Sequence, residues 1–530
     1  MNATIVNAPI VATTASRDPA FRPMRDTRGR GTVRAWMLPV SMGVLLPLVG
    51  LLAAWPLAAG WLSPDLADRW TRALLATADV GAFRDLTGTA YPLLPLAADM
   101  LLALLPGLGG MPPPLLVNVL AVTLAAGLWV RMMAAGGHGF AWAVITAGLL
   151  LLQPALALSV AGGGPAVPGL LFFTIVVSSA LRLHRAGEVN AMIGLGVALA
   201  GLAVTDAAGA YMVLAAIPFL ALLLPPRMVA TSASGSLLVV LFPLLFAALA
   251  LFYVNWVFGG SPLAFAAGVD AAIRGAAGDI GGSRWLMGPG AGFGGALTAG
   301  AALLLLSGPL LLAGIVLGDA GARRVLVLLA ALLLVAIVLA SATRFLGDPG
   351  RVLAYLPPVC ALAAAIAGRQ RLPGAAVAVL ALAGLLGGWW GQGWSGDAQS
   401  AGWRAALHGP VPQPDERAGQ VALGRFLRPL DDVAIDGLTA GAAVPARGTA
   451  RGLVLPSNDR LKADLITGRL RSAHLALRDP SSPAGARDRI AQARPGLWLD
   501  AGPGARLLYD RDGWRVWRLA DGDDMSGVVK

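Results

Sequence analysis

Two aspartates that directly follow the first long apolar segment are the residues of this chain best placed to do chemistry. Asp65 and Asp68 stand three positions apart in WLSPDLADRW, and residues at that spacing share one face of a helix. A carboxylate beside an apolar layer can accept a proton from a hydroxyl group as a general base, or bind a divalent cation that neutralises a phosphate. The same letters also fit a plain helix start, with Ser63 as the N-cap and Pro64 in the first turn.

Arginines in later polar stretches are candidate partners for a phosphate group. Arg274 and Arg284 stand in one stretch between apolar segments, and Arg344 and Arg351 stand in another. An arginine can hold a phosphate through two parallel hydrogen bonds. The alternative is a water-exposed loop, which carries such charges without any ligand. Asp206 is a further isolated acid near the end of an apolar segment.

The composition indicates a protein that crosses a membrane many times. Of the 530 residues, 57% are hydrophobic and 13% are charged, and the mean hydropathy is +0.71. A soluble protein needs far more charge on its surface. The formal net charge of +11 is mostly arginine, which membrane proteins place in cytoplasmic loops. We therefore expect no nucleic-acid partner. The single cysteine, Cys360, is expected to be a small buried side chain.

Apolar runs long enough to cross about 30 Å of hydrocarbon occur about eleven times. They lie near 35–61, 114–134, 139–160, 165–183, 190–206, 208–225, 235–257, 295–317, 323–342, 352–368 and 373–390. A further run, YPLLPLAADMLLALLP at 91–106, is shorter, has two prolines near its start and contains Asp99. It could span the membrane or lie at the membrane surface.

The basic residues favour one of these two alternatives. Six arginines between Arg17 and Arg34 place the N-terminus in the cytoplasm by the positive-inside rule. The later loops carry Arg131, Arg182, Arg185, Arg227, Arg323, Arg324, Arg369 and Arg371. All of these are cytoplasmic if 91–106 does not cross, and all are external if it does. We therefore predict a juxtamembrane or re-entrant helix at 91–106, inside an external loop that covers 62–113.

The same count assigns the remaining loops to the two sides. It places on the external side the loops near 159–167, 205–209, 258–294 and 341–351, together with everything after Trp390. The first 34 residues lack the apolar core of a signal peptide and are expected to form a disordered basic tail in the cytoplasm.

Composition changes after the last apolar run, where a second domain is expected at 400–530. A helix near 415–428 precedes short apolar runs typical of strands at 433–436, 452–456 and 474–478, and a helix is expected around 484–494. The end, ARLLYDRDGWRVWRL, has two alternating runs on either side of Asp512 and Gly513, which is a strong hairpin signal. The fold prediction is an all-α polytopic membrane domain at 35–392, followed by a small soluble α/β domain.

The usual enzymatic sequence motifs are absent. The chain has no GxxxxGK[ST], HExxH, paired CxxC or GxSxG. The four histidines are scattered over loops and the second domain, which argues against a histidine metal site. Glycine clusters such as AGGGPAVPG favour close helix packing or flexible loops over a phosphate-binding loop. The candidate chemistry therefore depends on the carboxylates.

The order of these features resembles the membrane glycosyltransferases of the GT-C superfamily. An N-terminal span is followed by an external loop that opens with an acid and then by TAYPLLPLAADMLLALLPG. Within the superfamily the sequence is most similar to protein O-mannosyltransferases, the lipid A aminoarabinose transferase and related bacterial enzymes. Asp65 takes the position of the leading acid, and YPLLPL at 91–96 takes that of the Pro-Leu entry to the next helix. The resemblance extends over about 60–390.

The resemblance implies transfer of a sugar from a polyprenyl-phosphate donor to a lipid, glycan or protein acceptor, on the periplasmic face of a bacterial inner membrane. It implies that Asp65 acts as general base or positions the acceptor, that Asp68 assists it, and that a divalent cation is a possible cofactor. The residues expected to bind substrate are Tyr91, Arg274, Arg284, Arg344 and Arg351. Two alternatives stay open, which are a transporter or flippase and a non-catalytic component of a surface-polysaccharide assembly system. A transporter is expected to carry ionisable residues at mid-membrane depth, where this sequence has almost none.

Overall fold

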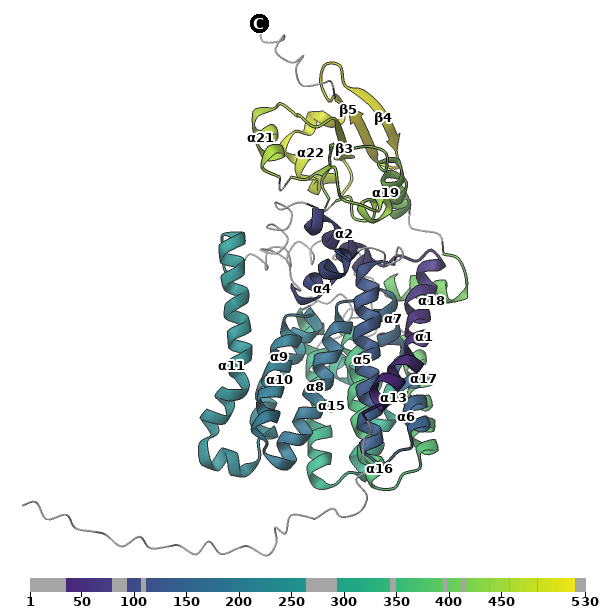
Figure 1. Cartoon of the computed structure of the whole chain (residues 1–530), viewed down its shortest axis with the longest axis vertical. Helices are drawn as coiled ribbons and strands as arrows, with labels where there is room; N and C mark the ends of the chain where they lie inside the picture. The colour runs from purple at the N-terminus through teal and green to yellow at the C-terminus, as the bar shows by residue number, and fades with distance from the viewer. Residues whose placement is uncertain are drawn as a thin grey trace, which may run out of the picture.

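The structure is a computed structural model in which a helical bundle carries a small α/β domain at one end (Figure 1). It describes residues 35–78, 93–105, 111–263, 293–343, 349–393, 398–411, 415–437, 439–456, 458–483 and 485–519. Within these ranges the prediction of a helical membrane domain followed by an α/β domain is confirmed.

The bundle helices form where the sequence is rich in alanine and leucine, and several begin with proline, whose missing N–H is not needed in the first turn. They are α1 (Met37–Ala58), α5 (Pro113–Ala135), α6 (Phe140–Leu151), α7 (Pro154–Ala161), α8 (Ala166–Ala186), α9 (Val189–Ala203), α10 (Ala207–Leu223), α11 (Pro226–Gly259), α13 (Phe293–Ser307), α14 (Pro309–Leu317), α15 (Ala320–Thr343), α16 (Leu356–Arg369) and α17 (Gly374–Gln392).

In the described part of the chain, seven helices are long and apolar enough to cross a membrane, or up to nine if two bent pairs are each one span. Each of the eleven apolar runs in the sequence coincides with one helix or one bent pair. The bends, 71° between α6 and α7 and 82° between α13 and α14, occur where Pro154 and Pro309 begin the second helix. Proline lacks the N–H that would continue the first helix. The helices α9 and α10 have 15 and 17 residues, so they are shorter than the expected spans.

Two further helices cover one end of the bundle. They are α2 (Pro64–Ala78), which is amphipathic, and α4 (Leu93–Ala103), which is apolar. With 11 residues, α4 is about 16 Å long, roughly half the hydrocarbon thickness. Both lie at the end of the bundle next to the α/β domain (Figure 1). This agrees with the prediction that the segment 91–106 does not cross the membrane.

The opposite end of the bundle gathers loops that the charge count assigned to the cytoplasm. Arg185, at the end of α8, forms an ion pair of 2.5 Å with Asp319, just before α15. The C-terminal end of α16, which carries Arg369, lies at the same end of the bundle (Figure 1). The alternation of loops between two sides is therefore present in the structure.

The C-terminal domain contains a five-stranded sheet in the order β2-β1-β3-β5-β4. Its strands are β1 (Val433–Ala434), β2 (Leu453–Val454), β3 (His474–Arg478), β4 (Arg506–Arg511) and β5 (Trp514–Arg518), and its helices are α19 (Asp415–Phe426), α20 (Ala443–Arg447), α21 (Asp459–Thr467) and α22 (Arg489–Ala493). The strands β1, β2 and β3 are parallel, and β5 is antiparallel to both β3 and β4. All five expected strands are present, and the hairpin turns at Asp512 and Gly513, which both have positive φ as a two-residue type I′ turn requires.

The helix α18 (Ala398–His408) packs with the membrane helices. Trp403 on α18 is buried and stacks on Trp389 of α17, with 5.2 Å between ring centroids, and Trp61 belongs to the same cluster. The sheet domain thus begins at α19, whose first residue, Asp415, lies 15 positions after the boundary expected at 400. The sheet domain in turn rests on α2. Thr71 Oγ1 donates a hydrogen bond of 2.6 Å to the Gly441 carbonyl.

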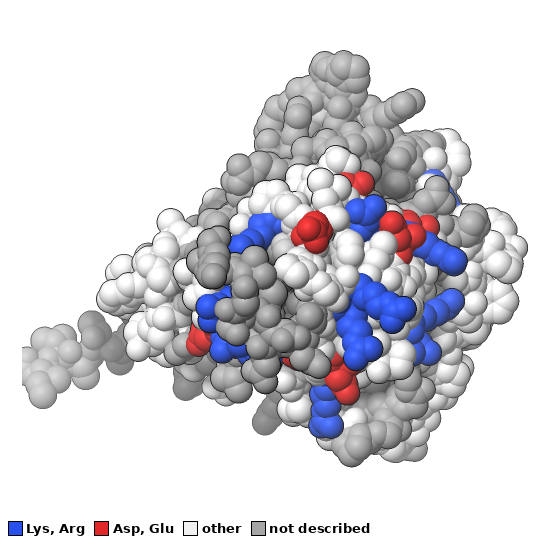
Figure 2. All heavy atoms as spheres, turned by 90° about the horizontal axis from the view of Figure 1, so that it is seen from above, with Lys and Arg blue, Asp and Glu red and all other residues white. Residues whose placement is uncertain are grey.

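Charged side chains are exposed at the end of the molecule that carries the sheet domain (Figure 2). Viewed from the end that carries the sheet domain, basic and acidic side chains are interspersed over the surface (Figure 2). The large exposed apolar side chains lie mainly on the bundle helices, for example Phe246 and Leu249 of α11, as expected for helices that face lipid.

Candidate active site

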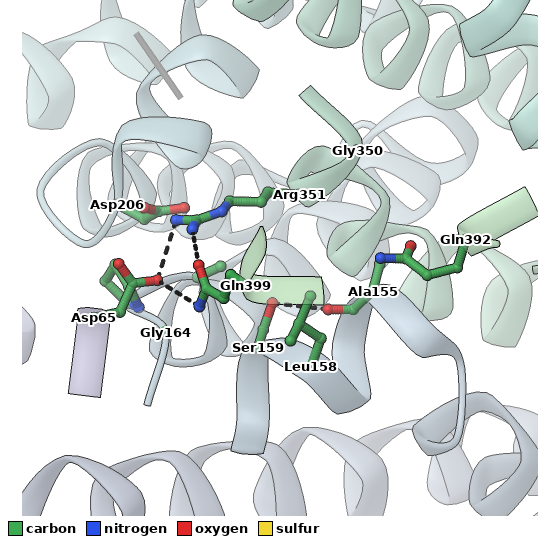
Figure 3. Close-up of a pocket in the computed structure, with 12 residues that line it drawn as sticks. Asp65, Ala155, Leu158, Ser159, Gly164, Asp206, Gly350, Arg351, Gln392 and Gln399 are labelled. Atoms are coloured by element: carbon green, nitrogen blue, oxygen red, sulfur yellow. Dashed lines mark hydrogen bonds and ion pairs between the residues drawn. The ribbon is translucent and has the colours of Figure 1, made fainter. Parts of the chain in front are cut away.

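An open pocket lies where the bundle meets α2 and α18. Its polar lining consists of Asp65, Ser159, Asp206, Arg351, Gln392 and Gln399. These residues come from α2, α7, the turn before α10, the 3-10 helix η1 (Pro349–Tyr355), the end of α17 and α18 (Figure 3). The sequence placed each of these segments on the external side or at an external end of a span. The pocket is therefore built by loops that the charge count assigned to a single side.

Asp65, Arg351 and Gln399 form the polar centre of the pocket. Arg351 Nη1 lies 3.1 Å from Asp65 Oδ2, and Arg351 Nη2 donates a hydrogen bond to Gln399 Oε1. Gln399 Nε2 donates a longer bond of 3.5 Å to Asp65 Oδ2. The side chains of Arg351 and Asp65 are 32% and 26% exposed, so a substrate can reach both. The three side chains point toward one another (Figure 3).

Asp206 is the second acid of the pocket and lies deeper than Asp65. It is 6% exposed, and Tyr355 Oη donates a hydrogen bond of 3.4 Å to its Oδ2. Burial raises the pKa of Asp206 to about 6, while the Arg351 guanidinium lowers it and the Asp65 carboxylate raises it. The pocket therefore contains one carboxyl group that titrates close to neutral pH.

A buried arginine fixes the position of α2, the helix that carries Asp65. Arg69 Nε and Nη2 donate to the two carboxylate oxygens of Asp99 on α4 at 2.9 and 2.7 Å. Arg69 Nη1 donates to the Gly163 carbonyl at 2.5 Å and to Asn118 Oδ1 of α5 at 3.2 Å. The Asp99 side chain is fully buried. One guanidinium thus connects α2 with α4, with α5 and with the turn between α7 and α8.

The glycine run that follows α7 lets the start of α2 approach closely. Ser63 Oγ donates to the Gly162 carbonyl at 2.5 Å and accepts from Leu66 N at 2.9 Å, so Ser63 is the N-cap that the sequence predicted. Gly163 has φ +64°, and a Cβ added there would lie 3.0 Å from Leu66 Cα. Close packing thus accounts for this cluster, and Asp65 lies both in the first turn of α2 and in the pocket.

The structure brings together two of the residues predicted from the sequence, Asp65 and Arg351. Asp68 lies in a second pocket, where Arg72 Nε is 2.9 Å from its carboxylate, so its assistance to Asp65 stays a prediction. The other four predicted residues, Tyr91, Arg274, Arg284 and Arg344, lie outside the residues that the structure describes.

Sequence reasoning missed Gln392 and Gln399 and gave Asp206 no role. The available signal for the two glutamines was their place directly after the last span, on the predicted external side. Among the described residues, no group of three or more His, Cys, Asp or Glu side chains is arranged to hold a metal ion. The divalent cation stays a prediction.

Comparisons with known proteins return structures but no sequence relatives. No family model and no curated protein matches the chain. ArnT from Cupriavidus metallidurans, solved bound to undecaprenyl phosphate, aligns over 91% of this chain and 98% of its own with 14% identity and a TM-score of 0.41. The apo state of the same protein aligns over 90% and 98%, with 14% identity and a TM-score of 0.40. ArnT is an aminoarabinose transferase, one of the groups that the sequence resembles.

Proposed function

We propose that this protein is a membrane glycosyltransferase that moves a sugar from a polyprenyl-phosphate donor to a hydroxyl group of a lipid, glycan or protein acceptor. The observation that carries the proposal is the pairing of Asp65 with Arg351 at 3.1 Å in an open pocket at one end of an apolar bundle. A candidate base and a candidate phosphate ligand are thus adjacent, where a lipid-linked donor could reach both. We place this end on the periplasmic face of an inner membrane, with the N-terminus in the cytoplasm.

Arg351 is proposed to bind the donor phosphate. Its guanidinium can form two parallel hydrogen bonds with a phosphate, and the developing charge of the leaving group is stabilised by a fixed cation. The phosphate competes with Asp65 for Arg351, so donor binding releases the Asp65 carboxylate from the pair. Gln399, which contacts both side chains, is positioned to hold Asp65 afterwards.

Asp65 is proposed to act as the general base. The acceptor oxygen attacks the anomeric carbon of the sugar and gives its proton to the Asp65 carboxylate. The bond between the anomeric carbon and the phosphate oxygen breaks, and its electron pair leaves with the polyprenyl phosphate bound at Arg351. The products are the glycosylated acceptor, polyprenyl phosphate and a proton on Asp65, which is then lost to solvent. The divalent cation suggested by the resemblance enters no step of this scheme.

The charged side chains favour an enzyme over the transporter alternative. In the described ranges, none of the fully buried charged residues lies inside the seven long apolar helices. A transporter or flippase is expected to place such groups along its path at mid-membrane depth. The buried acids and arginines instead lie where the bundle meets α2 and in the sheet domain.

The test replaces one carboxylate and follows the surface glycans. A strain that lacks the gene is complemented with the wild-type chain, with Asp65→Asn, or with Asp459→Asn, which changes an exposed acid of the sheet domain. We expect Asp65→Asn to reproduce the glycan or glycolipid profile of the deletion at an unchanged protein level, because removal of a general base costs about 10²- to 10⁴-fold in rate. Asp459→Asn should restore the profile. Restoration by Asp65→Asn would remove Asp65 from catalysis and favour the non-catalytic alternative.

A further inference from the structure

A second open pocket lies between α2 and the sheet domain. Asp68, Thr71 and Arg72 of α2 form one side of it, and Arg417 and Gln420 of α19 lie on the other. The two units are joined beside it, because Arg417 Nη1 donates to the Leu62 carbonyl and Thr71 Oγ1 donates to the Gly441 carbonyl. The pocket is thus part of a fixed interface between the bundle and the sheet domain.

The topology of the sheet places this pocket at a position where α/β folds bind ligands. The strand β1 lies between its parallel neighbours β2 and β3. The connection from β1 to β2 runs through α20, which packs on one face of the sheet, and the connection from β2 to β3 runs through α21, which packs on the other. The strand order therefore reverses at β1, and such a switch point leaves a crevice at the carboxyl ends of the strands. Gly437, shortly after β1, lines the pocket.

The pocket walls combine paired charges with small residues. The Asp68 and Arg72 side chains are 52% and 30% exposed, and their pair presents hydrogen-bond acceptors and donors side by side. Gly437, Gly441 and Ala442 form the opposing wall. A Cβ added at Gly437 would lie 2.8 Å from Leu75 Cδ1, so a larger residue there would displace the Leu75 side chain. A sugar ring has vicinal hydroxyls that both donate and accept hydrogen bonds. Because Gly437, Gly441 and Ala442 have small side chains or none, the ring can approach the backbone closely.

We propose that this second pocket binds a hydroxyl-rich sugar unit of the acceptor. The assignment to the acceptor rests on the proposed function, whereas binding of a sugar there does not. Asp65 and Asp68 are one helical turn apart on α2, which corresponds to a rise of about 4.5 Å, and Pro64 also lines the second pocket. A sugar bound at Asp68 can therefore present a further hydroxyl to Asp65 across the first turn of α2. The two aspartates then serve two pockets, with Asp68 binding the molecule on which Asp65 acts.

The experiment measures binding, without a donor and without turnover. Hydrogen exchange of the full-length protein in lipid nanodiscs is followed with glucose, mannose or N-acetylglucosamine, and with inorganic phosphate as the anion control. We expect at least one sugar to slow exchange in residues 64–72 and 439–444. Asp68→Asn should weaken that protection about tenfold in apparent affinity, because a hydrogen bond to a charged group is lost. The exposed control Asp459→Asn should leave it unchanged.

The outcomes separate this inference from the proposed function. Asp65→Asn should lose glycan transfer yet keep the sugar protection at α2, because its carboxylate lines the other pocket. Protection by phosphate and by no sugar would overturn the inference, as would protection that persists in Asp68→Asn at unchanged melting temperature. If Asp65→Asn keeps transfer while the sugars still protect α2, the proposed role of Asp65 is wrong and the sugar site stands.

Discussion

Asp65 and Arg351 form an ion pair in the pocket, and the proposed reaction requires them to separate. At 3.1 Å and partly exposed, the pair is weak enough for a phosphate to displace the carboxylate, because partly exposed ion pairs contribute only about 1 kcal/mol or less. The ion pair thus keeps the proposed base and the proposed phosphate ligand next to each other before a donor binds. Gln399 bonds to both partners, which limits how far each can move.

Two substitutions at Arg351 should separate the contribution of its positive charge from that of its planar shape. Arg351→Lys keeps the positive charge but loses the planar fork, so we expect the KM for the donor to rise about tenfold, which corresponds to roughly 1.4 kcal/mol. Arg351→Gln should lower kcat/KM by a further tenfold or more, because the leaving group then lacks a cation. Both are measured as initial rates in nanodiscs, beside Arg506→Lys, an exposed change on β4. Equal rates for all three variants would exclude Arg351 from donor binding.

Asp206 should make donor binding depend on pH. Its pKa of about 6 means that it is mainly ionised at pH 7.5 and mainly protonated at pH 5. A donor phosphate adds negative charge beside it, so the donor binds more tightly where Asp206 is neutral, and affinity should rise as the pH falls through 6. The neutral variant Asp206→Asn should bind with the tighter, low-pH affinity throughout. If the donor affinity of the wild type were as independent of pH as that of Asp206→Asn, Asp206 would not control donor binding.

The contribution of Asp206 to folding stability changes with pH in the same direction as the donor affinity, so it also rises as the pH falls. Its pKa is raised in the folded state, so its contribution to folding stability is full below about pH 4 and is lost as the pH rises through 6. The displacement from 3.8 to about 6 corresponds to a cost on the order of 3 kcal/mol at neutral pH. Such a cost at the centre of a pocket is typical of a group retained for function.

The buried ion pair between Arg69 and Asp99 is one of the contacts that hold α2 in place, and it can be tested separately from the chemistry. Arg69→Met leaves the Asp99 carboxylate buried without its partner, and we expect a loss of about 3–5 kcal/mol in stability. Asp99→Leu should cost less, because Arg69 still donates to Gly163 and Asn118. The double variant should be more stable than Arg69→Met alone, which would establish the coupling.

Thermal unfolding in nanodiscs measures these variants. The control is Lys462→Met, which breaks an exposed ion pair in α21 and should change stability by less than about 1 kcal/mol. Additive effects of the two single changes would show that the pair does not connect α2 to α4. Glycan transfer should fall with Arg69→Met, because Asp65 moves with α2.

The apolar runs predicted where the helices lie. They did not predict the bends, because a bend depends on single residues such as proline, which a hydropathy average does not detect. Pro154 and Pro309 turned two expected spans into bent pairs, and the sequence had shown only a long apolar run at each. The short elements of the sheet domain, α20 and α21, were not predicted, because their form depends on packing against a sheet whose strand order is nonlocal. Asp65 and Arg351, which form an ion pair, are 286 positions apart in the sequence. The sequence could predict only that both lie on the same side of the membrane, not that they are in contact.

The organisation of the whole molecule follows from charge placement. Segments that the positive-inside rule assigned to the external side converge on one pocket, and Arg185 and Asp319 pair at the other end. This agreement between sequence and structure argues for alternating loops. If the segment 91–106 crossed the membrane, Asp65 and the later pocket residues would lie on opposite sides. The pocket, α2 and the sheet domain therefore lie together at one end of the bundle.

A topology experiment decides which side of the membrane this end faces. A reporter that is active only outside the cytoplasm, fused after Gly409 at the end of α18, should be active, because α18 lies beside the pocket. The same reporter fused after Gly187, at the end of α8 near the Arg185 pair, should be inactive. Activity at Gly187 and none at Gly409 would invert the assignment and place Asp65 in the cytoplasm. Equal activity at both positions would contradict the alternation itself, because Gly409 follows the helix that lines the pocket, whereas Gly187 ends α8 beside the Arg185 pair.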